Sequence, residues 1–441
     1  MLGLRSLRSL RPRRVNQYWV GLVKSSAAFG GLDTELVSGG AATRRAALWT
    51  YVHILTLLYY FLVVASFLSY LLDVMSASQI NIREALKKHS MFTHDRLEYR
   101  VEEVFAIIQE TKQLFMEEPS LLEIPVPVVI VGDVHGQYAD LHRIFTMVGD
   151  RGRSGTTKRR FLFLGDYVDR GKLSLEVICC LLVHKLAFPR MFNLLRGNHE
   201  CSLINSIYGF HAELCERFPL KEADKLWTAF NDLFNWLPLA ALVHGKILCM
   251  HGGFGEALKS LDDLRCIKRP ISDPNSNTLV LDLLWADPMI DLKGFVPNTM
   301  RGVSVFFGEN TVNDLCKKLK VDLIVRAHQV MLNGFAFYCG RKLVTIFSAP
   351  RYDTDRNNKG AVLMVDRQLR VSFRILSPVT HATKGVENFR KEYLRNEKES
   401  AYITRKQAME GTSAMPEQPV ACDSITQPPG NENTKEKPGQ N

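Results

Sequence analysis

Short apolar runs recur through the middle of the chain, and most end in glycine and a polar side chain. The runs are residues 127–131, 161–164, 191–195, 246–250, 321–325 and 343–347. Their length of four or five residues is typical of buried strands, and the stretches between them are long enough for helices. An apolar pattern of helical period, from Leu97 to Ile108, precedes the first run. This alternation predicts an α/β layer fold.

The polar residues that follow these runs include a set of oxygen and nitrogen ligands. In open α/β sheets ligands bind at the carboxyl ends of the strands, so we expect these side chains to converge. The set holds aspartate, asparagine and histidine but no cysteine, which favours Mn, Fe or Zn in a mixed O/N site over a structural zinc. The set has three carboxylates, one amide and four imidazoles, and its members include Asp133, His135, Asp166, Asn198, His199, His251 and His328.

Residues 46–72 form a run of 27 residues without a formal charge. As a helix this run would extend about 40 Å, enough to cross a hydrocarbon layer of about 30 Å. It therefore predicts one transmembrane helix; a buried core helix and a late signal-peptide core are the alternatives. Basic residues flank both ends, so the charge count does not fix the orientation. Residues 1–32, with five Arg, one Lys and no acid, also fit a mitochondrial transit peptide.

Composition narrows the class of protein. The 441 residues are 46% apolar and 23% charged, which is typical of a globular chain. Nine cysteines without a C-x-x-C spacing predict neither a disulfide framework nor a thiolate zinc site. Free thiols are typical of a reducing compartment, so we expect the catalytic domain of this predicted membrane protein to face the cytosol. Residues 1–46 supply +6 of the +10 net charge, leaving +4 for the other 395 residues. A strongly basic nucleic-acid binder is thereby disfavoured.

We therefore divide the chain into four segments. Residues 1–45 are a basic tail, 46–72 the predicted transmembrane helix and 80–377 the catalytic domain. Residues 378–441 are polar and rich in proline, and we expect them to be largely disordered.

Three blocks carry a resemblance to a known family. They are Gly132-Asp-Val-His-Gly, Gly165-Asp-Tyr-Val-Asp-Arg-Gly and Leu195-Arg-Gly-Asn-His-Glu. They resemble the signatures of the phosphoprotein phosphatases, a metallophosphoesterase family, and Leu284-Trp-Ala-Asp-Pro is most similar to the type-1 serine/threonine phosphatase catalytic subunit. The resemblance implies a metallophosphoesterase-like four-layer α/β/β/α sandwich, in which helices flank a central β-sandwich. It also implies hydrolysis of phosphoserine and phosphothreonine on protein substrates.

The resemblance further implies a role for each site residue. Asp133, His135 and Asp166 would hold one divalent ion, and Asp166 would bridge to a second held by Asn198, His251 and His328. Two such ions can generate a bridging hydroxide that attacks phosphorus. His199, oriented by Asp169, would protonate the leaving alkoxide. The remaining implied catalytic residues are Arg170 and Arg301, which would hold the phosphate, and Tyr352, which would close the site.

Two other functions stay open at this point. The same site could hydrolyse small phosphoesters, or the chain could be a catalytically silent membrane scaffold. Regulatory subunits are expected partners if an apolar groove exists, although the same residues could belong to an ordinary core. The groove positions are Ile247, Leu323, Phe337, Val344, Ile346, Leu369 and Phe373.

Overall fold

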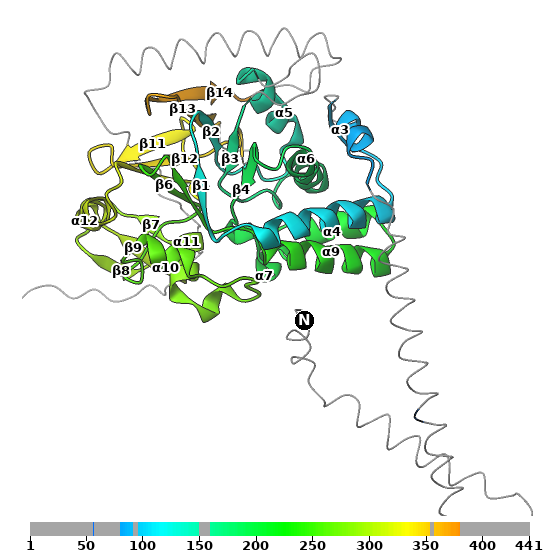
Figure 1. The fold of residues 1–441 in the computed structure, drawn as a ribbon, viewed down its shortest axis with the longest axis horizontal. Coiled ribbons are helices and arrows are strands. Elements are labelled where there is room, and N and C mark those ends of the chain that lie inside the picture. Colours follow the sequence, from blue (N-terminus) through cyan, green and yellow to red (C-terminus); the bar gives the residue numbers. More distant parts are fainter. Residues whose placement is uncertain (1–55, 57–79, 91–95, 150–158, 353–356, 380–441) are drawn as a thin grey trace, which may run out of the picture. The chain divides into compact units, whose positions relative to one another are not determined.

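The computed structural model describes residues 56, 80–90, 96–149, 159–352 and 357–379 (Figure 1). The chain divides into two units, Met1–Ala77 and Ser78–Asn441, and all described residues except Thr56 lie in the second. The predicted basic tail, nearly all of the predicted transmembrane segment 46–72 and most of the polar segment 378–441 lie outside the described residues. Within the described ranges, no helix has both the length and the apolar character needed to cross a bilayer.

Two large sheets and one small sheet organise the second unit. The six-stranded sheet has the order β1 (Leu121–Ile124), β5 (Ala240–Val243), β6 (Ile247–Met250), β10 (Leu323–Arg326), β12 (Leu343–Ile346), β11 (Phe335–Tyr338). The five-stranded sheet has the order β14 (Val371–Leu376), β13 (Gly360–Val365), β2 (Val128–Val131), β3 (Phe161–Phe163), β4 (Phe192–Leu194). The small sheet joins β7 (Asp287–Pro288), β9 (Val305–Phe307) and β8 (Phe295–Pro297).

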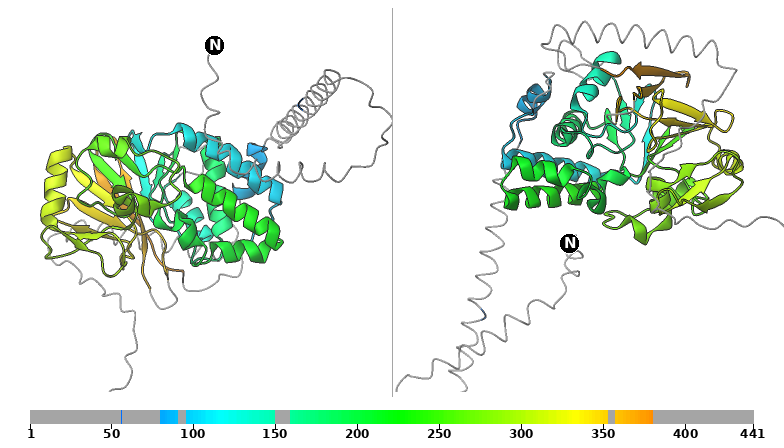
Figure 2. Two further views of the ribbon diagram at one scale, coloured as in Figure 1. Left: turned by 90° about the horizontal axis from the view of Figure 1, so that it is seen from below. Right: turned by 180° about the vertical axis from the view of Figure 1, so that it is seen from behind.

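Helices surround these sheets (Figures 1 and 2). The first group, which begins with α3, is α3 (Ile82–Ser90), α4 (Val101–Glu117), α5 (Tyr138–Met147), α6 (Ser174–Ala187), α7 (Ser202–Asn205), α8 (Phe210–Arg217) and α9 (Leu220–Phe234). The second group is α10 (Leu261–Arg265), α11 (Thr278–Trp285) and α12 (Glu309–Leu319). In Figure 1, α4 and α9 lie side by side, and α12 lies at the opposite side of the molecule.

Alternating side chains along the strands build three cores. In β2, Val129 and Val131 face the core shared with α4, α5 and α6, whereas Val128 and Ile130 face the core between the two large sheets. In β6, Leu248 and Met250 pack toward the third core, which includes residues of α11 and α12. Because both faces of each sheet are covered, the strands are apolar on both sides. The layers are thus helices, sheet, sheet and helices, the α/β/β/α arrangement that the resemblance implied.

The predicted strand ends are divided between the two large sheets, with β2, β3 and β4 in one sheet and β6, β10 and β12 in the other. The two sheets meet at an isolated bridge between Asp133 and Phe347, which brings both sets of strand ends together. One local expectation needs correction, because the helix predicted from Leu97 to Ile108 begins at Val101 and not near Leu97. The Leu97 N–H donates to buried Glu176 at 2.8 Å, a tertiary contact that holds this segment outside the helix.

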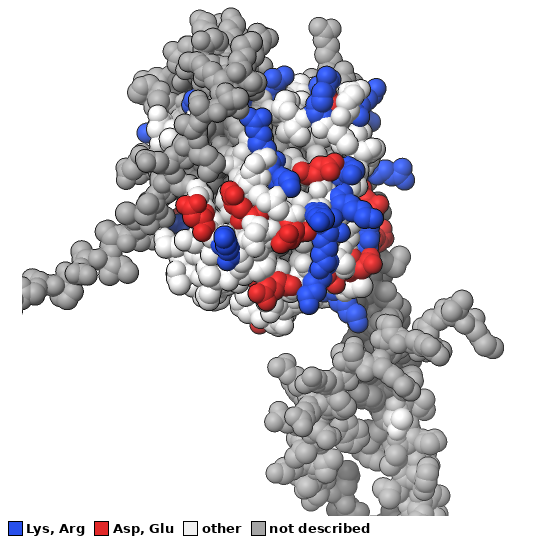
Figure 3. All heavy atoms as spheres, turned by 90° about the vertical axis from the view of Figure 1, so that its left-hand side faces the viewer, with Lys and Arg blue, Asp and Glu red and all other residues white. Residues whose placement is uncertain are grey.

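Charged side chains are interspersed on the face around α12. Figure 3 shows Lys and Arg next to Asp and Glu there, without separation of the two signs into opposite halves. The basic bias of the whole sequence therefore does not produce a uniformly basic surface on this face.

Candidate active site

The loops after the strands hold the backbone in unusual conformations. Left-handed φ values occur at His135 (39°), Asp166 (56°), Asp169 (71°), Arg170 (66°) and His328 (68°). A non-glycine residue in this region costs of order 1–3 kcal/mol and persists only where surrounding contacts enforce it. Five of the eleven predicted site residues therefore lie in strained loop backbone, which aims their side chains.

Two glycines let the loops after β3 and β4 approach each other. A Cβ on Gly165 would lie 2.3 Å from the backbone nitrogen of Gly197, and a Cβ on Gly197 would lie 2.2 Å from an Asp166 carboxylate oxygen. Neither position has room for a larger residue. At Gly197 the requirement is close approach to the site carboxylate, since its φ of −96° is open to any residue.

Asp166 lies at the centre of the site. One carboxylate oxygen is 3.4 Å from His135 Nε2, and the other is 3.3 Å from His251 Nε2. The backbone N–H of His199 donates to this second carboxylate oxygen at 3.0 Å. The backbone N–H of His328 donates to a carboxylate oxygen of Asp133 at 3.1 Å. The loops after β2, β4 and β6 thus place polar groups around the buried carboxylate of Asp166.

The histidine rings present lone pairs to the centre. His135 Nδ1 lies 2.9 Å from the Val168 carbonyl and His251 Nδ1 lies 3.1 Å from the Leu164 carbonyl. A carbonyl only accepts, so these bonds require a proton on Nδ1, and whenever the ring is neutral Nε2 is left as an acceptor. Burial lowers the pKa of His135, whereas for His251 burial is outweighed by the Asp166 carboxylate, which raises the pKa. His251 Nε2 then faces Asn198 Oδ1 at 2.8 Å and His328 Nδ1 at 3.1 Å.

This crowding of acceptors fits bound cations. Ligand atoms of His135, Asp166 and His199 lie within 4.8 Å of one another, and so do those of Asp166, His251 and His328. Asp166 belongs to both groups. In the part of the chain that the structure describes, His328 Nε2 is buried without a hydrogen-bond partner. An all-O/N donor set suits divalent metal ions, and cations would satisfy these otherwise opposed lone pairs.

Burial and mutual charge set the protonation of the central groups. Burial, helped by the neighbouring Asp166 carboxylate, raises the pKa of Asp133 to about 6. Burial also lowers the pKa of His135 to about 3 and keeps the ring neutral, as a metal ligand must be. For Asp166 burial acts in the opposite direction, but the charges of His251 and His199 outweigh it and hold the pKa below its usual range.

His199 and Asp169 form a buried pair beside this centre. His199 Nδ1 lies 2.6 Å from one Asp169 oxygen, and the Phe210 N–H donates to the other at 2.9 Å. Burial alone would lower the pKa of His199, but Asp166 and the bond to Asp169 overcome it and raise that pKa. His199 Nε2 points toward the centre, 4.0 Å from Asp166. The pair can therefore hold a proton next to the ligand groups.

The three rim residues differ in their surroundings. The exposed Arg170 guanidinium lies over the Tyr208 ring at 4.2 Å, and the Asp169 carboxylate is occupied by His199 and Phe210, so no Arg170–Asp169 ion pair is seen among the described side chains. Arg301 donates to Asp287 at 2.9 Å and to the His328 carbonyl at 3.1 Å. The Tyr352 ring lies 5.0 Å from the His135 ring. The structure thus places all eleven predicted site residues in or beside one centre.

Sequence reasoning missed the supports of this centre. Asp287 accepts from Arg301, from Arg326 at 2.8 Å and from Asn298 at 3.0 Å, and it is 2% exposed. Glu200, fully buried, accepts backbone N–H bonds from Asp166, Tyr167 and Gly197. Both residues stand inside quoted sequence blocks, but nothing in the spacing indicates what they would contact.

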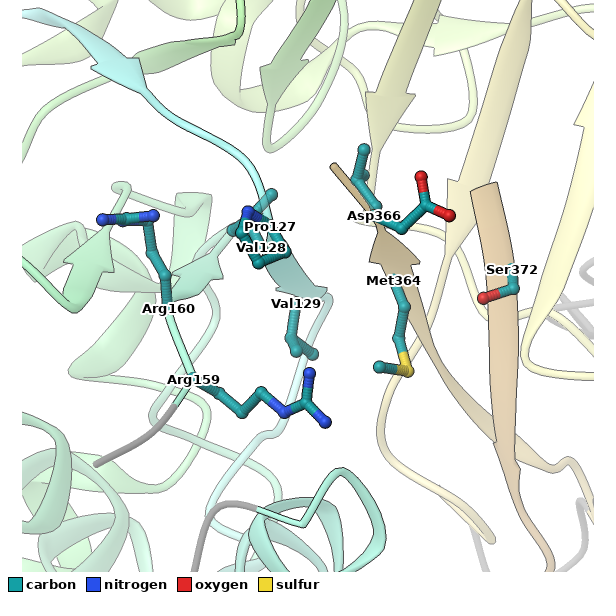
Figure 4. A pocket seen from close by; sticks show the side chains of 9 residues that line it. Pro127, Val128, Val129, Arg159, Arg160, Met364, Asp366 and Ser372 are labelled. Carbon is teal, nitrogen blue, oxygen red and sulfur yellow. The ribbon is translucent and has the colours of Figure 1, made fainter. Parts of the chain in front are cut away.

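Two further features, the predicted groove positions and a cavity that the sequence did not predict, lie apart from the predicted ligands. Five of the groove positions are core residues between the two large sheets, and only Phe337 and Leu369 are half-buried. A separate cavity of about 100 Å³ is lined by residues of β2, β13 and β14 together with Arg159 and Arg160 (Figure 4). Neither feature contains a predicted ligand.

Comparison with known proteins agrees with the geometry. A family model described as calcineurin-like phosphoesterase matches residues 126–332. The serine/threonine-protein phosphatase PP1-delta of Caenorhabditis elegans is 45% identical over 267 residues, which are 60% of this chain and 84% of that protein. A structure of a Saccharomyces cerevisiae protein serine/threonine phosphatase with similarity to human phosphatase PP5 matches 64% of this chain and 91% of its own, with 32% identity and a TM-score of 0.58.

The two-sheet fold and its cluster of strand-end ligands therefore define a metallophosphoesterase. Within that class, the chain belongs to the serine/threonine protein phosphatases and is an enzyme of that kind. Enzymes of this class use divalent metal ions, and the residues described above fit that requirement. The silent-scaffold alternative is thereby set aside.

Proposed function

We propose that the enzyme removes phosphate from phosphoserine and phosphothreonine in proteins through a dinuclear metal site. Asp133, His135 and Asp166 would hold one ion, and Asp166 would be shared with a second ion held by the side chains of Asn198, His251 and His328. The observation that supports this most directly is that Asp166 belongs to two overlapping groups of ligand atoms, with a histidine facing each of its oxygens. Mn is the first candidate, with Fe and Zn as alternatives.

When bound, two divalent cations would supply an acidified water as nucleophile and positive charge on the phosphate oxygens. His199 is proposed as the proton donor to the leaving seryl or threonyl oxygen. Its raised pKa and its 2.6 Å contact with Asp169 favour the protonated ring that this role needs. Because Nδ1 is engaged with Asp169, the proton on Nε2 is the one available to the substrate.

Arg170 and Arg301 are proposed to bind the phosphate oxygens. The Arg170 guanidinium is exposed and stacks on the Tyr208 ring, and its N–H groups are not paired with the Asp169 carboxylate. Arg301 is fixed by Asp287 through Nε, so its outer nitrogens are held beside the His328 backbone. A guanidinium held in this way can fork onto a phosphate with little loss of conformational entropy on binding. Tyr352, over the His135 ring, would limit water entry from that side.

We further propose that the segment 46–72 tethers the enzyme to a membrane with the catalytic domain in the cytosol, and mitochondrial targeting is the alternative. The support is the uncharged length of that segment and the arginine-rich residues before it. Regulatory subunits are proposed partners, with Phe337 and Leu369 as the accessible part of the apolar groove.

The catalytic proposal is tested with the full-length protein, elemental analysis and two substrates. We expect the unaltered enzyme to release phosphate from a phosphoserine peptide, and Asp166→Asn to lose this activity and to hold two metal ions fewer per chain than the unaltered enzyme. A single ion per active chain would contradict the dinuclear site. A preference of orders of magnitude for a dinucleotide would favour the small-phosphoester alternative.

The membrane proposal has a separate test. A C-terminally tagged full chain should stay with the membrane fraction after alkaline extraction, whereas a chain lacking residues 1–75 should be released. Release of the full chain would refute the tether without affecting the catalytic proposal.

A further inference from the structure

A third group of ligand atoms lies on the helices α8 and α9, apart from the predicted active-site ligands. His211 and Cys215 are one helical turn apart on α8, and Asp224 faces them from α9. His211 Nε2 is 2.9 Å from Asp224 Oδ1, and Cys215 Sγ is 3.8 Å from the same nitrogen. One nitrogen, one sulfur and one oxygen atom thus lie within 4.8 Å of one another.

These separations are close to those of a tetrahedral metal site. Zinc bonds of about 2.0–2.1 Å to nitrogen and oxygen and about 2.3 Å to sulfur give ligand-to-ligand distances of roughly 3.3–3.6 Å. The observed 2.9 and 3.8 Å differ from that range by a few tenths of an ångström, which small side-chain rotations would correct. Three protein ligands would leave a fourth position for water.

A histidine–aspartate ion pair explains part of this arrangement, and the thiol adds only a weak sulfur contact of 3.8 Å to the same nitrogen. The thiol lies beside the histidine nitrogen that already faces Asp224, so a metal ion accounts for all three groups together. The His211 ring is also held edge-on to Trp227 at 5.2 Å, and the Trp227 indole N–H donates to Asn205 at 2.7 Å. The ring is therefore oriented before any ion binds.

We propose that His211, Cys215 and Asp224 form a zinc-binding site distinct from the catalytic centre. The His211 and Asp224 side chains are 32% and 66% exposed, so ions can reach the site from solvent. Binding would join α8 to α9 through the metal. Since α8 begins at Phe210, whose N–H holds Asp169, the ion would also stiffen the segment behind the His199–Asp169 pair.

Cobalt titration of the purified full-length enzyme tests this site without relying on activity. Cobalt bound by a thiolate absorbs strongly in the near ultraviolet, whereas the predicted catalytic ligands are all oxygen and nitrogen. We expect this absorption to saturate at one equivalent and to be displaced by zinc. Cys215→Ser should abolish it while keeping phosphatase activity, which shows that the variant folds.

The matched control is Cys266→Ser, because Cys266 is exposed and outside the cluster. It should leave the absorption unchanged. His211→Ala and Asp224→Asn should each weaken zinc binding by about 10–100-fold or more, the range seen even when only a supporting partner of a ligand is lost. No absorption in the unaltered enzyme, absorption that survives Cys215→Ser, or loss in Cys266→Ser would overturn the proposal.

Discussion

Replacement of Asp169 by asparagine isolates the proton-transfer role proposed for His199. The Asp169 side chain makes two contacts, one with His199 Nδ1 at 2.6 Å and one with the Phe210 N–H at 2.9 Å. Asparagine can keep the second contact through its carbonyl oxygen. It removes the negative charge that favours the protonated ring, and its NH₂ group would face His199 as a donor.

The expected loss depends on the leaving group. A positioned general acid contributes about 10²–10⁴-fold, or roughly 3–5 kcal/mol of barrier. We expect kcat of Asp169→Asn to fall by about that factor with a phosphoserine peptide, whose alkoxide needs a proton. With p-nitrophenyl phosphate, whose phenolate leaves unprotonated, the loss should stay within about tenfold. Because Asp169 helps to raise the pKa of His199, the pH above which peptide hydrolysis declines should also move downward.

The assay is steady-state kinetics on both substrates for the unaltered enzyme, Asp169→Asn, His199→Ala and the double variant. If Asp169 acts only through His199, the double variant should be no slower than His199→Ala. Equal losses on the two substrates would refute the reasoning. They would mean that Asp169 mainly supports the backbone at Phe210 rather than the donor.

Three further outcomes follow from single features of the structure. Arg301→Lys should raise KM and lower kcat by at least about tenfold, because lysine cannot reproduce a guanidinium fixed by Asp287; kinetics matching the unaltered enzyme would show that charge alone suffices. Gly197→Ala should lower the free energy of unfolding by about 1–3 kcal/mol or more, since its Cβ would meet Asp166, and urea denaturation checks this. Burial, with nearby histidine charges, holds the pKa of His89 well below 6.5, so the unfolded chain takes up the proton at a higher pH than the folded chain. The free energy of unfolding should therefore fall by up to about 1.4 kcal/mol per pH unit as the pH drops below 6.5. Urea denaturation at several pH values should show this slope for the unaltered protein and a flatter slope for His89→Gln.

The sequence was informative about the site because its residues occur in short local blocks. Asp133 and His135 are two residues apart, as are Arg326 and His328, and each pair follows a recognisable apolar run. Strand-end chemistry of this kind depends on neighbouring residues alone. The apolar runs therefore predicted an α/β layer fold with candidate ligands at the strand ends, and the resemblance of the blocks to a family implied the ligand set, the four-layer arrangement and the reaction class. The membrane segment also came from the sequence and stays a prediction.

The tertiary structure decided which distant groups meet. Arg301 is paired with Asp287 and His328, from different elements, and the two sheets, joined at Asp133 and Phe347, bring the strand ends to one place. Likewise, the cluster on α8 and α9 exists only because the two helices pack so that Asp224 reaches His211. Such contacts depend on how sheets and helices pack over long sequence separations, so no local pattern in the sequence predicts which of these groups meet.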